Sequence, residues 1–164
     1  MTDNELIQLS TRVGERLLAR HSSVTTAESC TGGWIAKVLT DVAGSSAWFQ
    51  RGFVTYSNDA KQQMIGVTEA SLTQFGAVSE QVVQEMAQGA LREAGAQYAI
   101  SVSGVAGPDG GSDEKPVGTV WFGFASASGE VLTLVQRFSG DREAVRRQAT
   151  AWALQTLHDH FLKN

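Results

Sequence analysis

Hydrophobic residues recur at helical spacing near the start of the chain. Over residues 3–20, Leu6, Leu9, Val13, Leu17 and Leu18 lie three or four positions apart or side by side. This spacing predicts an amphipathic helix with one buried face. Further helices are predicted over 32–44, where Gly44 ends the pattern, and over 58–65, 79–94 and 141–162. The last helix is expected to bury Val145, Ala149, Trp152 and Leu157.

Shorter apolar runs predict strands between these helices. Segments 23–28 and 51–57 have strand length, and 97–107 is a nearly continuous apolar run, typical of a strand covered on both faces. Segments 118–126 and 130–138 are separated by three residues, Ala-Ser-Gly, and predict an antiparallel hairpin. Helices and strands alternate first and the hairpin comes late. The order predicts a three-layer α/β/α sandwich with a mixed β-sheet, as a single domain over 1–164.

Composition narrows the class of protein. The chain has 164 residues, 42% hydrophobic and 18% charged, with a formal net charge of −4, which is typical of a globular protein with no basic nucleic-acid surface. Its N-terminus has no signal-peptide pattern, and no apolar run approaches the length of a membrane span. One cysteine, Cys30, precludes an intramolecular disulfide. We therefore expect a cytoplasmic protein without a metal, a cofactor, or a nucleic-acid or membrane partner.

The segment Ser-Cys-Thr-Gly-Gly at 29–33 is the first candidate for chemistry. A strand that ends at Glu28 and a glycine-rich helix start would direct backbone N–H groups toward whatever Ser29 attacks, where they would stabilise an oxyanion. The alternative is that Ser29 or Thr31 only caps a helix, which is a common role. Cys30 is a second possible nucleophile, although a small buried residue is the commoner reading of such a cysteine.

A serine nucleophile requires a base. The three histidines fall at predicted helix ends away from this turn, and Gly32 stands where a Ser-x-x-Lys pattern would need lysine. Lys61 follows a predicted strand that also carries Tyr56. It would serve as a base if burial lowered its pKa, with Tyr56 relaying or donating a proton. From the residues alone, an exposed helix lysine is the more frequent case.

Two further segments could bind a ligand. The loop at 103–111 follows the predicted central strand, the usual place of a ligand in open α/β sheets. Arg142 and Arg146 lie at the start of the last predicted helix, where they could hold a phosphate. The alternatives are that the loop is a simple turn and that the two arginines are only solvated.

Together, the segments at 26–33, 52–61, 76–80, 103–111, 115–121 and 138–148 occur in an order that is highly specific. With them the chain resembles the C-terminal domain family of the competence/damage-inducible protein CinA, in its stand-alone amidase form. The resemblance runs over nearly the whole chain. It implies metal-independent hydrolysis of the carboxamide of nicotinamide mononucleotide, giving nicotinate mononucleotide and ammonia in pyridine-nucleotide salvage, and a homodimer.

The resemblance also implies roles for residues. Ser29 matches the family nucleophile, Lys61 its base and Tyr56 an assisting residue. The substrate-binding residues expected from these motifs are Thr31, Gly32, Gly33, Asn58, Ser103, Gly104, Gly107, Asp109, Gly110, Arg142 and Arg146.

Two other functions remain open at this point. A nucleotide sensor would use the same glycine-rich loops without turnover. A serine amidase of another type would draw its serine from Gly-Ser-Ser at 44–46, but the long Gly/Ser-rich signature of such enzymes is missing.

Overall fold

The computed structural model describes residues 1–163, in which one or more helices precede each of the first three strands. The helices and strands are α1 (Asp3–Ala19), β1 (Val24–Glu28), α2 (Trp34–Thr40), η1 (Ser45–Ala47), β2 (Phe49–Val54), α3 (Asn58–Ile65), α4 (Glu69–Phe75), α5 (Glu80–Ala94), β3 (Tyr98–Gly104), β4 (Thr119–Ser126), β5 (Val131–Arg137), α6 (Arg142–Thr156) and η2 (Leu157–Leu162).

The five strands form one mixed sheet in the order β2-β1-β3-β4-β5. The central strand β3 pairs in parallel with β1 and antiparallel with β4. Strand β2 is parallel to β1, and β5 is antiparallel to β4. Parallel neighbours need crossover helices, whereas β4 and β5 are joined by a tight turn. The carboxyl ends of β1, β2 and β3 therefore meet at one edge of the sheet.

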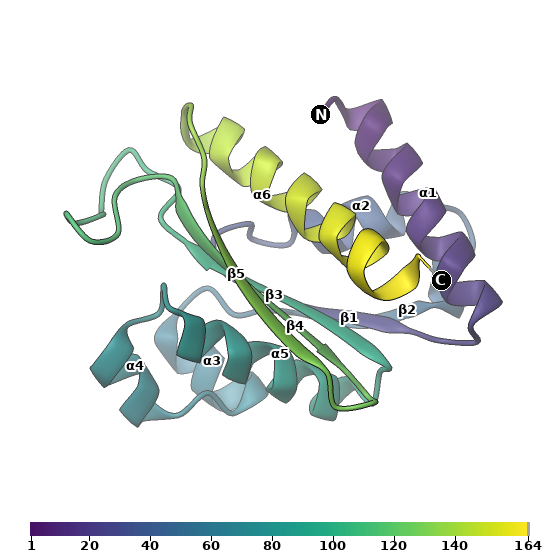
Figure 1. Cartoon of the computed structure of the whole chain (residues 1–164), viewed down its shortest axis with the longest axis horizontal. Coiled ribbons are helices and arrows are strands. Elements are labelled where there is room, and N and C mark those ends of the chain that lie inside the picture. Colours follow the sequence, from purple (N-terminus) through teal and green to yellow (C-terminus); the bar gives the residue numbers. More distant parts are fainter. Residues whose placement is uncertain (164) are drawn as a thin grey trace.

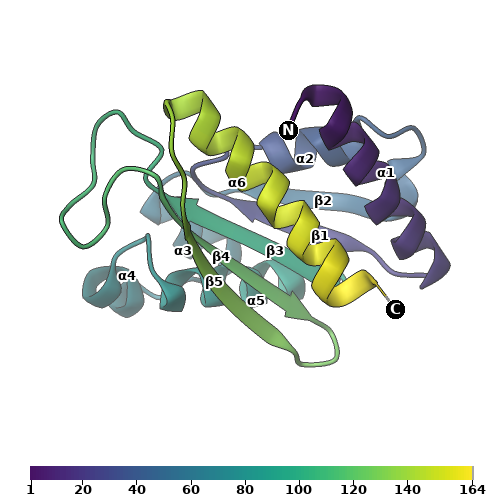
Figure 2. The same cartoon turned by 45° about the horizontal axis from the view of Figure 1, so that its top comes forward.

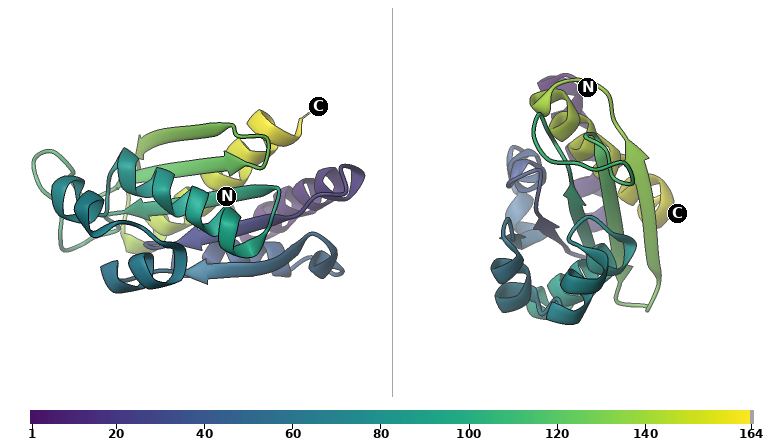
Figure 3. Two further views of the ribbon diagram at one scale, coloured as in Figure 1. Left: turned by 90° about the horizontal axis from the view of Figure 1, so that it is seen from below. Right: turned by 90° about the vertical axis from the view of Figure 1, so that its left-hand side faces the viewer.

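Helices cover both faces of the sheet (Figure 1). Helices α1, α2 and α6 lie on one face, and α3, α4 and α5 lie on the other, where α5 crosses the strands (Figure 3). Each face has its own buried apolar cluster, one including Leu9 of α1 and Leu154 of α6, the other including Val83 and Met86 of α5. The predicted three-layer α/β/α sandwich with a mixed sheet is confirmed.

Most predicted elements are present, with shifted ends. Helix α3 has the predicted bounds, and α5 begins after Ser79, whose hydroxyl accepts a hydrogen bond from the Val82 amide. Helix α2 is shorter than predicted, because it ends at Thr40 and Gly44 instead precedes a 3₁₀ turn. The prediction omitted α4, a short helix in which Leu72 is the buried residue.

Two apolar positions of the predicted helices are less buried than their neighbours in the core. Leu18 is 52% exposed, because it lies beside the buried stripe of α1 rather than within it. Trp152 is only partly buried and packs on the ring of Phe122, with ring centres 4.6 Å apart. The last predicted helix also changes character, since the segment after Thr156 continues as a π-helix.

The long loop between β3 and β4 extends past the sheet, at the same end as α4 (Figure 2). It follows the carboxyl end of β3, and so borders the edge where the parallel strands finish. None of the helices within residues 1–163 combines the length and apolar character needed to cross a membrane.

Candidate active site

A cavity of about 260 Å³ opens at the carboxyl ends of the three parallel strands. The connection from β1 to β2 uses α2 on one face, and that from β2 to β3 uses helices on the other, so the crevice beside β1 is the expected ligand site of such a sheet. The cavity is lined by Ser29, Cys30, Tyr56, Asn58, Lys61, Ala77, Val78, Ser103, Gly104, Ala106 and Arg142.

Ser29 is held in place by its own backbone. It directly follows β1, and its amide donates to the carbonyl of Val102 in β3, 3.0 Å away. One residue earlier, the Glu28 carbonyl accepts from the Thr55 amide at 2.8 Å. The residues beyond both β1 and β2 are thus fixed to neighbouring strands, and the Ser29 side chain lies on the cavity wall.

Lys61 brings its amine to the Ser29 hydroxyl from α3. The helix begins after Ser57, whose hydroxyl accepts a hydrogen bond from the Ala60 amide. Lys61 therefore lies in the first helical turn and faces inward. Its Nζ lies 3.0 Å from Ser29 Oγ and 2.9 Å from the Thr55 carbonyl oxygen. It also lies 3.5 Å from the Tyr56 carbonyl oxygen. In the neutral amine two N–H groups can still donate to these carbonyls, leaving the lone pair for the Ser29 hydroxyl proton.

Burial prepares Lys61 for proton transfer. The residue is only 1% exposed, and this burial lowers the pKa of the amine to about 8. Its hydrogen-bond partners are neutral oxygen atoms, so no carboxylate restores the pKa. The expectation of an exposed lysine, drawn from residue type alone, was wrong. It does hold for Lys37, whose side chain is exposed and forms an ion pair with Asp41 at 2.8 Å.

Glu28 holds the turn that follows Ser29. Its buried carboxylate accepts from the Thr31 hydroxyl at 2.6 Å and from the amides of Ile35 and Ala36 at 2.9 and 3.0 Å. Burial raises the pKa of Glu28, while these hydrogen bonds and one from the Gly33 amide oppose that rise. Because α2 has no side-chain cap of its own, this carboxylate satisfies the first amides of the helix.

The same contacts decide which amides remain for a ligand. The Gly32 amide donates to the Ser29 carbonyl at 3.0 Å, and that of Gly33 is directed to Glu28. Within residues 1–163, the amides of Cys30 and Thr31 donate to no backbone carbonyl. Any backbone stabilisation of an oxyanion therefore falls to these amides rather than to those of the glycines, and of the two residues Cys30 is the one that lines the Ser29 cavity.

Tyr56 and Arg142 stand together at the mouth of the cavity. Arg142 donates through Nη2 to the Tyr56 hydroxyl at 3.0 Å and through Nη1 to the Gly107 carbonyl at 2.9 Å. The Tyr56 side chain is 60% exposed, and only its backbone carbonyl lies near the Lys61 amine. Its hydroxyl is thus directed to Arg142 at the mouth, not to the Ser29–Lys61 pair at the base.

Arg146 lies elsewhere. It lines a second cavity, of about 440 Å³, which shares no lining residue with the first. There it donates through Nε to the Cys30 carbonyl at 3.0 Å and through Nη2 to the Thr31 carbonyl at 3.2 Å. The structure therefore does not bring the two predicted arginines to one site.

The remaining expected substrate-binding residues separate in the same way. Asn58, Ser103 and Gly104 line the Ser29 cavity, and Gly107 borders it through its bond to Arg142. Asp109 and Gly110 are exposed on the loop beyond and do not line the cavity. Three expected residues line the second cavity instead, namely Thr31, Gly32 and Gly33.

The alternative nucleophile and base are not favoured by their surroundings. Cys30 is 6% exposed, and burial raises the pKa of its thiol to about 12, so it is not a thiolate near neutral pH. Among the described residues no histidine lines the Ser29 cavity. Also within residues 1–163, no three His, Cys, Asp or Glu side chains cluster closely enough to hold a metal ion.

Sequence reasoning gave no role to several residues at the site. Glu28 was noted only as the end of a strand, yet its full burial beside a helix start is what fixes the turn. Ala77, Val78 and Ala106 form the apolar part of the wall. The signal for them was their presence in the motifs at 76–80 and 103–111, whereas their place in the same cavity as Ser29 depends on the fold.

Comparison with known proteins agrees with this architecture. Residues 6–161 match the family model described as the CinA C-terminal domain. The chain is 71% identical to the nicotinamide-nucleotide amidohydrolase PncC of Escherichia coli strain K12, over all of this chain and 99% of that protein. It is 55% identical to the protein of the same name from Pseudomonas putida, covering 91% and 92% of the two chains.

A solved structure is similarly close. The competence/damage-inducible protein CihA from Agrobacterium tumefaciens superimposes with a TM-score of 0.92 at 46% sequence identity, covering 96% of this chain and 94% of that one.

Proposed function

The chain belongs to the CinA C-terminal domain family, and we propose that it is an amidohydrolase that converts nicotinamide mononucleotide to nicotinate mononucleotide and ammonia. The substrate is supported by the names of close relatives over their full length. The observation that carries the chemistry is the 3.0 Å contact between Lys61 Nζ and Ser29 Oγ, at the base of a cavity.

In the first half-reaction Ser29 attacks the carboxamide carbon. Neutral Lys61 accepts the hydroxyl proton, the new C–O bond forms, and the carbonyl π electrons move onto oxygen as an oxyanion. The amides of Cys30 and Thr31 are the donors left for that oxygen. Protonated Lys61 then gives its proton to the departing nitrogen, the C–N bond breaks and ammonia leaves an ester on Ser29.

In the second half-reaction water replaces ammonia. Neutral Lys61 accepts a proton from water, the resulting hydroxide attacks the ester carbonyl, and Ser29 leaves with the proton returned by Lys61. With the pKa of Lys61 at about 8, roughly a tenth of the amine is neutral at pH 7. The same group can therefore serve as base and acid in each half-reaction.

The mouth of the cavity suits the rest of the substrate. Arg142 is oriented by two hydrogen bonds and supplies a cation for the 5′-phosphate. Tyr56 supplies an aromatic face, which attracts a cationic pyridinium ring. Within the described residues no carboxylate lines the cavity, so this face is the natural partner for the positive ring. We assign Tyr56 this binding role rather than proton transfer.

The assembly and location are part of the same proposal. The family resemblance supports a homodimer that works in the cytoplasm on a small-molecule substrate, without a nucleic-acid or membrane partner.

A nucleotide sensor is the competing function, and one experiment separates the two. Purified protein is incubated with nicotinamide mononucleotide and EDTA, and both ammonia and nicotinate mononucleotide are measured. An amidohydrolase forms the two products in equal amounts. Binding of the nucleotide without release of ammonia would contradict the proposal and favour the sensor.

A further inference from the structure

Arg146 contacts the nucleophile turn from outside the Ser29 cavity. Its guanidinium spans the carbonyls of two consecutive residues, Cys30 and Thr31, with distances of 3.0 and 3.2 Å. These contacts join residues more than a hundred positions apart in the chain. Since a guanidinium donates from a rigid planar fork, two bonds fix both the position and the orientation of the peptide groups.

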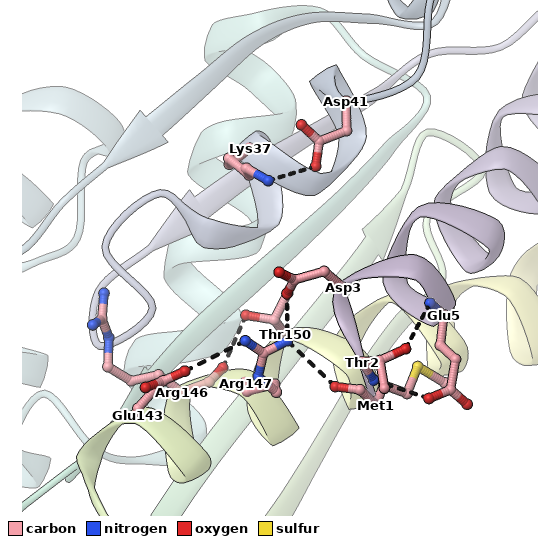
Figure 4. Close-up of polar contacts among 10 residues, drawn as sticks. All are labelled: Met1, Thr2, Asp3, Glu5, Lys37, Asp41, Glu143, Arg146, Arg147 and Thr150. Atoms are coloured by element: carbon pink, nitrogen blue, oxygen red, sulfur yellow. Dashed lines mark hydrogen bonds and ion pairs between the residues drawn. The ribbon is translucent and has the colours of Figure 1, made fainter.

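The surroundings hold Arg146 in this orientation. Its guanidinium carbon lies 5.7 Å from the centre of the Trp34 ring. The neighbouring Arg147 reaches in another direction, toward Asp3 and Glu143 (Figure 4). Gly32 leaves room for the contact, because a Cβ there would lie 3.2 Å from Arg146 Nη2, and its φ of +59° suits glycine.

The contact fixes the peptide unit that joins Cys30 to Thr31, next to a unit fixed by the backbone itself. In a trans peptide unit the C=O and N–H groups point in opposite directions. The Ser29 carbonyl is held by the Gly32 amide, and the Cys30 carbonyl is held by Arg146. The Cys30 N–H therefore points away from the Gly32 amide, and the Thr31 N–H points away from the Arg146 guanidinium. Within residues 1–163, neither N–H group donates to a backbone carbonyl.

We propose that Arg146 is a positioning residue that fixes the nucleophile turn through the Cys30 and Thr31 carbonyls, and with it the amides available to the oxyanion, and that it does not hold the substrate phosphate. This inference rests on the proposed amidohydrolase function. It predicts that Arg146 acts mainly in the transition state, where negative charge develops on the carboxamide oxygen, whereas Arg142 acts on bound substrate and product alike.

The test measures kcat and KM for Arg146→Met and Arg146→Lys, with Arg147→Met as the matched control on the same helix. We expect kcat of Arg146→Met to fall about 10- to 10³-fold, while KM changes less than about threefold. Arg146→Lys should recover part of the loss, because it keeps a cationic donor but not the planar fork. Arg147→Met should keep wild-type kcat. Thermal unfolding identifies any variant that fails to fold, and Arg146→Lys then carries the test.

A binding measurement gives a second readout. An analogue with an aldehyde in place of the carboxamide can add Ser29 and place its oxygen where the oxyanion forms. Its affinity should fall with kcat in the Arg146 variants, while the affinity for nicotinate mononucleotide stays nearly constant.

Two results would overturn the assignment. One is an unchanged kcat together with unchanged analogue affinity. The other is a parallel loss of analogue and product affinity, which would make Arg146 a phosphate ligand. Wild-type ammonia release is measured first, so a failure of the proposed function is seen before the variants are compared.

Discussion

The nucleophile turn separates two cavities that are both lined by cationic side chains but differ in whether carboxylates accompany them. In the Ser29 cavity, Lys61 and Arg142 contact only hydroxyl and carbonyl oxygens. In the cavity lined by Arg146, carboxylates are present, and Arg147 pairs with Asp3 at 2.6 Å. Arg147 thus has carboxylate partners in the second cavity, whereas no carboxylate among the described residues lines the Ser29 cavity, where an anionic substrate and a neutral base are required.

The two lysines nearest the turn show the same contrast. Burial lowers the pKa of Lys61 to about 8, whereas the hydrogen bond with Asp41 raises the pKa of Lys37. Lys37 lies a few residues after the nucleophile turn, and Lys61 lies a few residues after the next strand. The difference between their pKa values therefore arises from packing. One lysine is a base near neutral pH and the other remains an ordinary cation.

Among the residues around the nucleophile, the largest expected effect comes from removing the Lys61 amine. Lys61→Met keeps the length of the side chain but has no proton acceptor, so kcat should fall about 10²- to 10⁴-fold. Steady-state release of ammonia measures this loss. Lys37→Met is the control and should retain wild-type kcat, since Lys37 is exposed and paired with Asp41. Equal losses in the two variants would contradict the contrast between them.

Arg142→Met is expected to act on binding. Losing a charged hydrogen-bond donor to the phosphate costs about 1.5–3 kcal/mol, which corresponds to a KM raised roughly 10- to 100-fold with a smaller change in kcat. Initial rates over a range of substrate concentration give both parameters. An unchanged KM would remove Arg142 from the substrate site and leave the phosphate to another group.

The pH dependence sharpens the assignment of the base. Because burial lowers the pKa of Lys61 to about 8, the neutral, active form increases as pH rises and is lost by protonation below pH 8. We expect kcat/KM to rise close to tenfold per pH unit below that value and to level off above it. The profile is measured between pH 6.5 and 9.5, a range chosen to span the pKa. A profile that is flat across pH 8 would rule out Lys61 as the titrating base.

Tyr56→Phe should have the smallest effect. The hydroxyl accepts a charge-assisted hydrogen bond from Arg142, but at this exposed position water can replace the hydroxyl, so its loss should cost about 0.5–1.5 kcal/mol rather than the larger value of a buried charged bond. The expected change in kcat/KM is thus less than about tenfold. Tyr56→Ala removes the aromatic face as well and should raise KM further. A large fall in kcat for Tyr56→Phe would show instead that the hydroxyl transfers a proton.

The sequence pattern predicted the scaffold better than the contacts that make the site. Helical spacing placed α3 at its observed bounds, and the apolar run at 97–107 contains the central strand β3. Burial of Lys61 did not follow from its type, because lysines are seldom buried without a partner. In the structure the buried amine is satisfied instead by neutral oxygens, among them the Thr55 and Tyr56 carbonyls.

Long-range contacts were also beyond the pattern. Arg146 and Arg142 are one helical turn apart and looked equivalent as phosphate ligands. The position of α6 over the nucleophile turn separates them, giving one the Cys30 and Thr31 carbonyls and the other the Tyr56 hydroxyl. Their difference therefore depends on how α6 packs and not on their local sequence.

The most direct test of the central claim is ammonia release from nicotinamide mononucleotide by Ser29→Ala beside Cys30→Ala. Both substitutions fall on the same turn, but only Ser29 has its side chain against the Lys61 amine. We predict that Ser29→Ala loses at least about 10³-fold in kcat, while Cys30→Ala stays within about tenfold of the wild type, since its thiol is buried and protonated. A loss of less than about tenfold in kcat for Ser29→Ala would correspond to a barrier raised by less than about 1.4 kcal/mol. That result would contradict the assignment of Ser29 as the nucleophile.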